Sequence, residues 1–428
     1  MCFAACLVIL GLRSFLSMSI ILMVRPPRDY SNESEIEIDD DRLEWPREWI
    51  PLLFSSPFVG TLVAFVVGFM CFNGAHHEKR TVLASLILAS VVTIISPIVA
   101  DFSFVTFAFL RFLMGVAEGF YFRSVNVIVG SWFPPSERAL TIATYTCGIQ
   151  TACGLAPYLA AVMSEINLSW KVMFYISGAF GLVISALWAV FVTDSPSESR
   201  FVGKKELQFI SEAMPKANNK SEPPPAVPWR SLLTSPAIHV HLLCIFAINF
   251  TVALVASFMP SYLKEEIHLP IAFNGLFTAA PFGVQILAKI IGGVLVDWRK
   301  RHGLSHTKAA KICQATGNFG TAISLIAFPF FTSPIPCLVM LLLYGAFSSL
   351  AVLGFFTTMT MIAPRFTGTV VAFIMAAGSI AMLSSTLLFT ALNYYNFESK
   401  FYIIFFVSAG TQVVAGIGYL MKGSESAL

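Results

Sequence analysis

Three ionisable residues interrupt one long apolar stretch of the sequence, residues 103–131, and these are Arg111, Glu118 and Arg123. Seven positions separate Arg111 from Glu118, which is close to two turns of an α-helix, so both side chains would project from nearly the same face. A guanidinium group can bind a carboxylate or a phosphate through two parallel hydrogen bonds. A carboxylate beside it can gain and lose a proton as an anion enters and leaves. This spacing therefore has the chemistry for binding an anion and for coupling that binding to a proton.

Other apolar stretches also carry basic residues. Counted over all apolar stretches, four basic residues (Arg13, Arg111, Arg123 and Lys289) stand against one acidic residue, Glu118, which is an excess of three positive charges. A charge at the centre of a bilayer costs at least about 2.5–3.5 kcal/mol, so these groups must face a bundle interior, a water-filled cavity or one another. A basic cavity attracts anions. We interpret Glu118 as the coupling residue. The candidate substrate-binding residues from this reasoning are Arg13, Arg111, Arg123, Asn126 and Lys289.

A purely structural role is the alternative for each of these residues. Arg111 and Glu118 would then form an ion pair that fixes two helices together, and Arg13 would be a structural group as well. Arg123 would extend its side chain to the cytosolic interface. Lys289 lies within about two turns of the cytosolic end of its stretch, so the same explanation applies to it. The spacing alone leaves both readings open.

The composition shows what kind of molecule must position these side chains. Of the 428 residues, 56% are hydrophobic and 12% are charged, about half the charged fraction of an ordinary soluble domain. A helix of about 20 residues crosses about 30 Å of hydrocarbon and satisfies its own backbone. The sequence therefore predicts an all-α membrane protein with twelve transmembrane helices in two pseudo-symmetric six-helix bundles. The twelve apolar runs are 3–24, 50–72, 81–100, 103–131, 139–163, 170–192, 237–262, 274–297, 309–331, 336–360, 367–391 and 400–421.

The connecting segments predict the domains and the orientation. Residues 1–192 would form the first six-helix bundle and residues 237–428 the second, joined by a cytosolic linker over 193–236. The linker and its neighbours on the same side are rich in Lys and Arg, which face the cytosol by the positive-inside rule. The loop 25–49 holds nine acidic residues and would lie on the other side. Both chain ends are then cytosolic.

Sequons at Asn32 and Asn167 fall on the non-cytosolic side and are predicted glycosylation sites. We expect no metal site, no catalytic residue and no cofactor other than Na⁺ or H⁺ as a coupling ion. The sequence has no H-E-x-x-H motif, no C-x-x-C pair and no Gly-rich phosphate loop. The chain is therefore not expected to be an enzyme, and its net charge of +3 gives no reason to expect a nucleic-acid partner.

Several short motifs, in the same order along the chain, resemble the anion:cation symporters of the major facilitator superfamily. The motifs are "RFLMGVAEG" (111–119), "SWFPPSER" (131–138), "GGVLVDW" (292–298) and "MIAPRFTG" (361–368). This group includes the sodium/phosphate cotransporters, sialin and the vesicular glutamate transporters. The resemblance implies a transporter of small organic or inorganic anions such as phosphate or a carboxylate. Transport would proceed by alternating access and would be coupled to Na⁺, H⁺ or the membrane potential.

The resemblance also assigns roles to particular residues. Arg13, Arg111 and Glu118 match the intramembrane charges that the family carries in its first and fourth spans. Asn249 matches an Asn of the seventh span and joins the candidate substrate-binding residues. The family's cytosolic loop, in which Gly and Asp precede basic residues, is represented by Asp297, Arg299 and Arg301.

The chain departs from the family pattern at positions that matter for specificity. Phe54 stands where glutamate-transporting members place a His, and Ile248 replaces an Arg of their seventh span. Met375 stands where an Asn is common. These departures argue against glutamate specificity, while the charges of the first and fourth spans keep the expectation of a small anion. It would cross a plasma membrane or an endolysosomal or secretory vesicle membrane. The alternative is a sensor or scaffold that derives from a transporter and moves no solute.

Overall fold

The computed structural model describes residues 1–24, 43–71, 77–133, 135–200, 202–213, 234–302, 305–359, 367–395, 397 and 399–422. Regular secondary structure within these residues is helical, apart from an isolated bridge between Val24 and Leu43. The helices of the first half are α1 (Cys2–Ser14), α2 (Leu16–Met23), η3 (Arg47–Trp49), α3 (Ile50–Cys71), α4 (Glu78–Ala100), α5 (Phe104–Trp132), α6 (Pro135–Glu165) and α7 (Trp170–Phe191). Those that follow are η4 (Pro196–Glu198), α8 (Lys204–Ala213), α10 (Pro236–Glu265), α11 (Ile271–Arg301), α12 (His306–Ala327), η5 (Phe328–Phe330), α13 (Pro334–Met359), α14 (Thr367–Tyr394) and α15 (Lys400–Lys422).

Eleven stretches of helix in the described chain are long and apolar enough to cross a membrane. They agree with eleven of the twelve expected spans, and α1 and α2 together form the first of them. The expected ninth span corresponds to α12, which is 22 residues long but less apolar. Lys308, Lys311, Gln314 and Asn318 lower its hydropathy. The polar side chains of Gln314 and Asn318 are buried among neighbouring helices, so they do not meet lipid.

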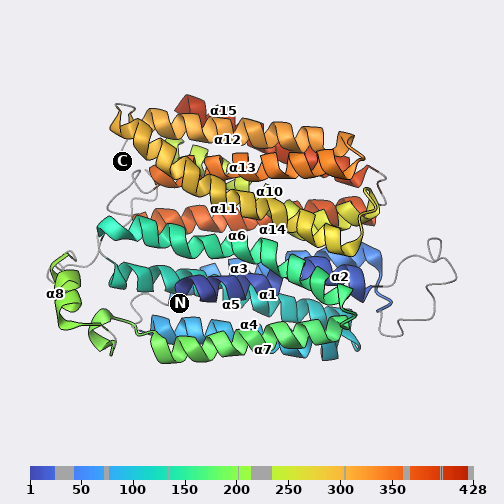
Figure 1. The fold of residues 1–428 in the computed structure, drawn as a ribbon, viewed down its shortest axis with the longest axis horizontal. Helices are drawn as coiled ribbons and strands as arrows, with labels where there is room; N and C mark the ends of the chain where they lie inside the picture. Colours follow the sequence, from blue (N-terminus) through green and yellow to red (C-terminus); the bar gives the residue numbers. More distant parts are fainter. Residues whose placement is uncertain are drawn as a thin grey trace.

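The helices of each half pack mainly against one another (Figure 1). In the first half α5 lies against α3 and α4, α4 lies against α7, and α1 lies against α6. In the second half α13 lies against α11 and α12, while α15 lies against α10 and α12. The two halves meet where α6 packs on α11, α3 on α14 and α2 on α10. The charged residues of α1 and α5 are thus held close to a seam between two bundles.

A structural repeat relates the two halves. A side chain at Gly115 of α5 would collide with the Pro57 carbonyl group of α3, and one at Gly345 of α13 would collide with the Pro281 carbonyl group of α11. In both bundles a glycine thus allows close contact with the helix that carries the proline. Arg111 lies one turn before Gly115, and the equivalent position in the second bundle is Leu341. The backbone is repeated, but the buried charge is not.

The segment between the bundles contains one feature that the sequence did not predict. Within the expected linker 193–236, residues Lys204–Ala213 form the amphipathic helix α8. The N-terminal end of α1 lies toward the end of the molecule that carries α8 (Figure 1). Part of this segment lies outside the described residues, so the boundaries at 192 and 237 stay predictions.

Candidate functional site

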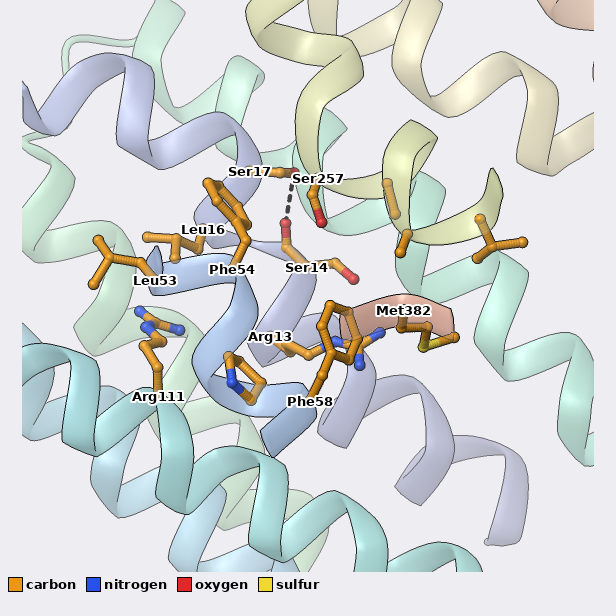
Figure 2. Close-up of a pocket in the computed structure, with 14 residues that line it drawn as sticks. Arg13, Ser14, Leu16, Ser17, Leu53, Phe54, Phe58, Arg111, Ser257 and Met382 are labelled. Carbon is orange, nitrogen blue, oxygen red and sulfur yellow. Dashed lines mark hydrogen bonds between the residues drawn. The ribbon is translucent and has the colours of Figure 1, made fainter. Parts of the chain in front are cut away.

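A small cavity lies between the two halves, and it is lined by side chains from α1, α2, α3, α5, α10 and α14 (Figure 2). It leaves about 30 Å³ for the centres of water-sized molecules, which is room for about two ordered waters. The fourteen lining residues are Arg13, Ser14, Leu16, Ser17, Leu53, Phe54, Pro57, Phe58, Arg111, Val252, Ala253, Ala256, Ser257 and Met382. Two of the candidate arginines therefore face the same space.

The first of them, Arg13, forms a salt bridge with Glu118 that joins α1 to α5. Arg13 Nη1 donates to both carboxylate oxygens of Glu118, at 2.9 and 2.8 Å. The side chains are 14% and 8% exposed, and the Arg13 guanidinium lies 5.0 Å from the centre of the Phe58 ring. Both bonds use one nitrogen of the guanidinium. Within the described residues, Nε and Nη2 of Arg13 have no further hydrogen bond, and Arg13 is one of the residues that line the cavity.

The main chain around Arg13 shows how it is positioned. Helix α1 ends at Ser14 and α2 begins at Leu16, and Phe15 between them keeps helical dihedrals (φ −56°, ψ −33°), so the backbone stays helical through this join, two residues after the arginine. Ser17 Oγ donates to the Ser14 carbonyl oxygen at 2.8 Å, which satisfies an acceptor next to Arg13.

The second arginine, Arg111, has no exposed surface and no acidic partner among the described residues. Its Nη1 is 3.2 Å from the Met114 sulfur, a weak acceptor. The guanidinium also lies 4.8 and 5.3 Å from the centres of the Phe107 and Phe174 rings. Nε and Nη2 have no hydrogen-bond partner in the described chain. A buried charge with unsatisfied donors is costly, so an acceptor that enters the cavity would gain a strong partner.

The structure thus separates two residues that the sequence placed on one face. Glu118 is paired with Arg13, which lies 105 positions away in the chain, and not with Arg111. Arg111 is left with aromatic neighbours. Two cations with different environments therefore reach one cavity, one neutralised by a carboxylate and the other not.

Arg123 and Asn126 lie outside the lining of this cavity. Arg123 is 3.5 Å from the carboxylate of Glu78, at the start of α4. The Asn126 side chain is exposed; it accepts a hydrogen bond from the Tyr145 hydroxyl at 2.6 Å and donates to the Phe122 carbonyl oxygen at 2.7 Å. Their expected role in binding stays a prediction, and the geometry gives them contacts between helices.

Lys289 and Asn249 also lie outside the lining. The Gln150 amide on α6 is oriented so that its nitrogen donates to the Thr146 carbonyl oxygen at 2.8 Å. In this orientation its Oε1 accepts a hydrogen bond from Lys289 Nζ on α11 at 2.9 Å. This contact bridges the two halves. Asn249 Nδ2 donates to the Ile245 carbonyl oxygen at 3.0 Å within α10.

Of the remaining predicted residues, Asn167 is exposed in the turn between α6 and α7, with a φ of 55°. Asn32 lies outside the described residues. Asp297, Arg299 and Arg301 occupy the last turns of α11, where the Arg299 guanidinium is exposed and lies 5.5 Å from the Trp298 ring. The side chains of Asp297 and Arg301 lie outside the described part of the chain.

Sequence reasoning missed most of the lining. Ser14, Ser17 and Ser257 bring hydroxyl groups to the cavity, and Met382 reaches it from α14. Ser14 could have been predicted as a lining residue, because it directly follows Arg13 in the sequence. The sequence gave no such indication for Ser257 and Met382, because nothing in a uniformly apolar helix marks the face that points inward.

Comparisons with known proteins agree with this architecture. Residues 7–386 match the family model of the Major Facilitator Superfamily. Among solved structures, a D-xylose–proton symporter superposes with a TM-score of 0.73 at 14% identity, covering 100% of this chain and 98% of the other. A bacterial homologue of the human lysosomal transporter Spinster, in an inward-facing, occupied conformation, gives a TM-score of 0.65 at 14% identity, covering 99% and 94%. At this identity the likeness shows the fold alone.

Relatives in sequence are more specific. The chain is 30% identical over 402 residues to the uncharacterized transporter slc-17.3 of Caenorhabditis elegans, covering 92% of this chain and 75% of the relative. It is 26% identical to vesicular glutamate transporter 3 of Danio rerio, covering 97% and 70%. It is 25% identical to sodium-dependent phosphate transport protein 3 of Mus musculus, covering 89% and 79%. With its helical fold and its family match, the chain belongs to the major facilitator superfamily and, within it, to the anion:cation symporter group.

Proposed function

We propose that this protein is a secondary active transporter of a small organic or inorganic anion, which binds in the cavity between the two halves. The observation that carries the proposal is Arg111, a fully buried guanidinium with two nitrogens that lack hydrogen-bond partners in the described chain. Such a group is retained in a membrane helix only at an energetic cost, which an anionic ligand would offset. The names of two relatives, a glutamate transporter and a phosphate transport protein, support an anion as the solute.

Arg13 and Glu118 are proposed to couple binding to a second ion. An anion that binds the free nitrogens of Arg13 competes for the positive charge that now neutralises Glu118. The carboxylate then gains from taking up a proton, because a buried charge without a partner is costly. Substrate and proton would bind together and leave together, which is the minimal requirement for symport. Na⁺ in place of H⁺ is the alternative for the same carboxylate.

The two bundles supply the proposed movement. The cavity lies at their seam and has room for about two waters in this conformation, so the bundles must part on one side at a time to admit and release a solute. By the charge of the connecting segments, the end that carries α8 would face the cytosol. The membrane would be the plasma membrane or that of an endolysosomal or secretory vesicle.

Reconstitution tests the proposal directly. The full chain is placed in proteoliposomes and uptake of phosphate, urate, glutamate and sialate is measured under imposed Na⁺ or pH gradients. We expect saturable uptake of at least one anion, and its loss in Arg111→Ala. Lys171→Met is the matched control, since it removes a positive charge that pairs with Asp101 outside the cavity. Saturable uptake that is unchanged in Arg111→Ala would contradict the proposed site. Absence of flux for every anion would favour a sensor or scaffold.

A further inference from the structure

We infer that residues 43–49, the outer segment, hold Arg111 in place through an aromatic contact, and that Trp45 is a positioning residue for this arginine. The outer segment joins α2 at the end of the molecule opposite α8 (Figure 1). The inference rests on the proposed function, in which Arg111 binds the anion. It gives a role in that site to a residue that does not line the cavity.

The main chain fastens the outer segment to the first bundle. Leu43 N donates to the Met23 carbonyl oxygen at 2.7 Å, and Leu43 also forms a parallel bridge with Val24. Both contacts attach the segment to the end of α2. After Trp45 the chain enters η3 and then α3. Trp45 is therefore held from both directions along the chain.

The Trp45 ring lies against the ring that contacts Arg111. It is 5.3 Å from Phe104 and 5.1 Å from Phe107, centre to centre, and both belong to the start of α5. Phe107 is fully buried, and the Arg111 guanidinium lies 4.8 Å from the centre of its ring. Contacts between rings, and between a ring and a cation, depend on orientation. Trp45 therefore restrains the Phe107 ring, which in turn restrains Arg111.

Arg111 needs such support because two of its nitrogens have no hydrogen-bond partner in the described chain. A guanidinium that is free to turn must be ordered when an anion binds, whereas one that is already held binds with a smaller entropic cost. Phe174 lies 5.3 Å from the same guanidinium and has Trp170 behind it at 6.0 Å. Each of the two phenylalanines beside Arg111 is thus supported by a tryptophan.

Trp45 differs from Trp170 because its segment also touches the second bundle. Trp170 is the first residue of α7. The outer segment, in contrast, contacts α14 through η3, as well as α3. When the bundles part at the outer end, the contact with α14 is lost and Trp45 is held on Phe107 less firmly. The outer segment therefore makes the restraint on Arg111 depend on closure of the outer end.

Arginine modification tests the inference without any transport. The full chain in detergent is treated with p-hydroxyphenylglyoxal, and mass spectrometry of its peptides compares modification of Arg111 with that of Arg299, which is exposed. We expect Arg111 to react about two- to tenfold faster in Trp45→Ala than in the wild type, since an aromatic contact contributes a factor of that size. Trp45→Phe keeps a ring and should stay close to the wild type.

Trp49→Ala is the matched control from the same segment. The Trp49 ring is 5.7 Å from Phe104 and, within the described residues, does not pair with Phe107, so its removal should leave the reactivity of Arg111 unchanged. An unchanged rate in Trp45→Ala, or an equal rise in Trp49→Ala, would overturn the inference. If Trp45→Ala does not fold, Trp45→Leu carries the same expectation, because it keeps apolar volume without the ring.

Uptake gives a second readout and separates the inference from the proposed function. For whichever of phosphate, urate, glutamate and sialate the reconstituted chain transports, we expect KM to rise about two- to tenfold in Trp45→Ala without a matching fall in kcat, and to stay unchanged in Trp49→Ala. An unchanged KM in Trp45→Ala would show that Trp45 only packs the fold, which overturns the inference. Absence of uptake for all four anions would overturn the proposed function, while the reactivity of Arg111 would still decide whether Trp45 holds it.

Discussion

At the scale of single residues, Arg13 and Arg111 show that one residue type can lie in two different environments around one cavity. Arg13 has a carboxylate partner and spare donors, so it can exchange one anionic ligand for another. Arg111 is held by aromatic faces, which attract a cation without satisfying its hydrogen bonds. The first is therefore suited to coupling and the second to attracting the solute.

This difference predicts an opposition between stability and function at Arg111. In Arg111→Met an unpaired buried charge is replaced by an apolar side chain of similar length; even for paired buried charges, replacement by packed apolar groups is neutral or stabilising by about 1–4 kcal/mol. We expect a higher thermal unfolding temperature in detergent together with loss of anion uptake. The measurement is thermal unfolding followed by intrinsic fluorescence, beside uptake by the same preparation. An unfolding temperature lower than that of the wild type would show that the charge has a partner that stabilises the fold.

At the scale of secondary structure, close contact between helices positions these side chains. Arg111 and Glu118 flank Gly115, where α5 meets the Pro57 turn of α3 without room for a side chain. The proline and the glycine fix the separation of the two helices, and so they fix how far both charges reach toward the seam.

Two glycines of the same helix therefore have different sensitivities. Gly115→Ala would force α5 away from the backbone of α3, and we expect a loss of about 1–3 kcal/mol or more in stability. Gly130→Ala meets no atom within 4 Å, and its higher helix propensity predicts a neutral to slightly stabilising change. Thermal unfolding of both variants in detergent measures the difference. Similar unfolding temperatures for the two variants would mean that the α3–α5 contact is looser than the structure shows.

The seam between α6 and α11 is a second place where elements control function. The Lys289–Gln150 contact joins the two halves, so it must be broken and remade if these helices part during transport. A hydrogen bond to a charged group contributes about 1.5–3 kcal/mol. Lys289 can therefore influence transport from outside the cavity, by favouring one conformation.

We expect Lys289→Met to loosen this seam. The half-buried Cys147 lies one turn before Gln150 on α6, and its rate of maleimide labelling in a chain without other cysteines should rise several-fold. Lys311→Met is the control, because Lys311 Nζ bonds the Leu420 carbonyl oxygen within the second half. Equal labelling rates in the Lys289 variant and the parent would show that this contact does not hold the halves together.

At the scale of the whole molecule, the sequence predicted the helices well because hydropathy over about 20 residues is a physical requirement of the bilayer. It also selected the helix that carries Arg111 and Glu118. It did not predict that Glu118 pairs with Arg13, because 105 positions separate them and spacing along one helix says nothing of a contact with another. The inward faces of α10 and α14 were missed for the same reason, since Ser257 and Met382 are placed by the packing of the two bundles.

The whole molecule must also convert an ion gradient into solute movement, and Glu118 is where the two would meet. In wild-type proteoliposomes, a pH lower outside than inside should accelerate anion uptake, because protonation of Glu118 on the outer side frees Arg13 for the anion. In Glu118→Gln the side chain is neutral at every pH. We expect that variant to keep exchange of anion for anion, which needs no net proton movement, and to lose the acceleration by the pH gradient. Uptake is measured with and without the gradient, and exchange is measured from anion-loaded vesicles. If gradient-driven uptake persists in the variant, the coupling ion binds elsewhere; if exchange is lost as well, Glu118 is needed to shape the site and not only to carry the proton.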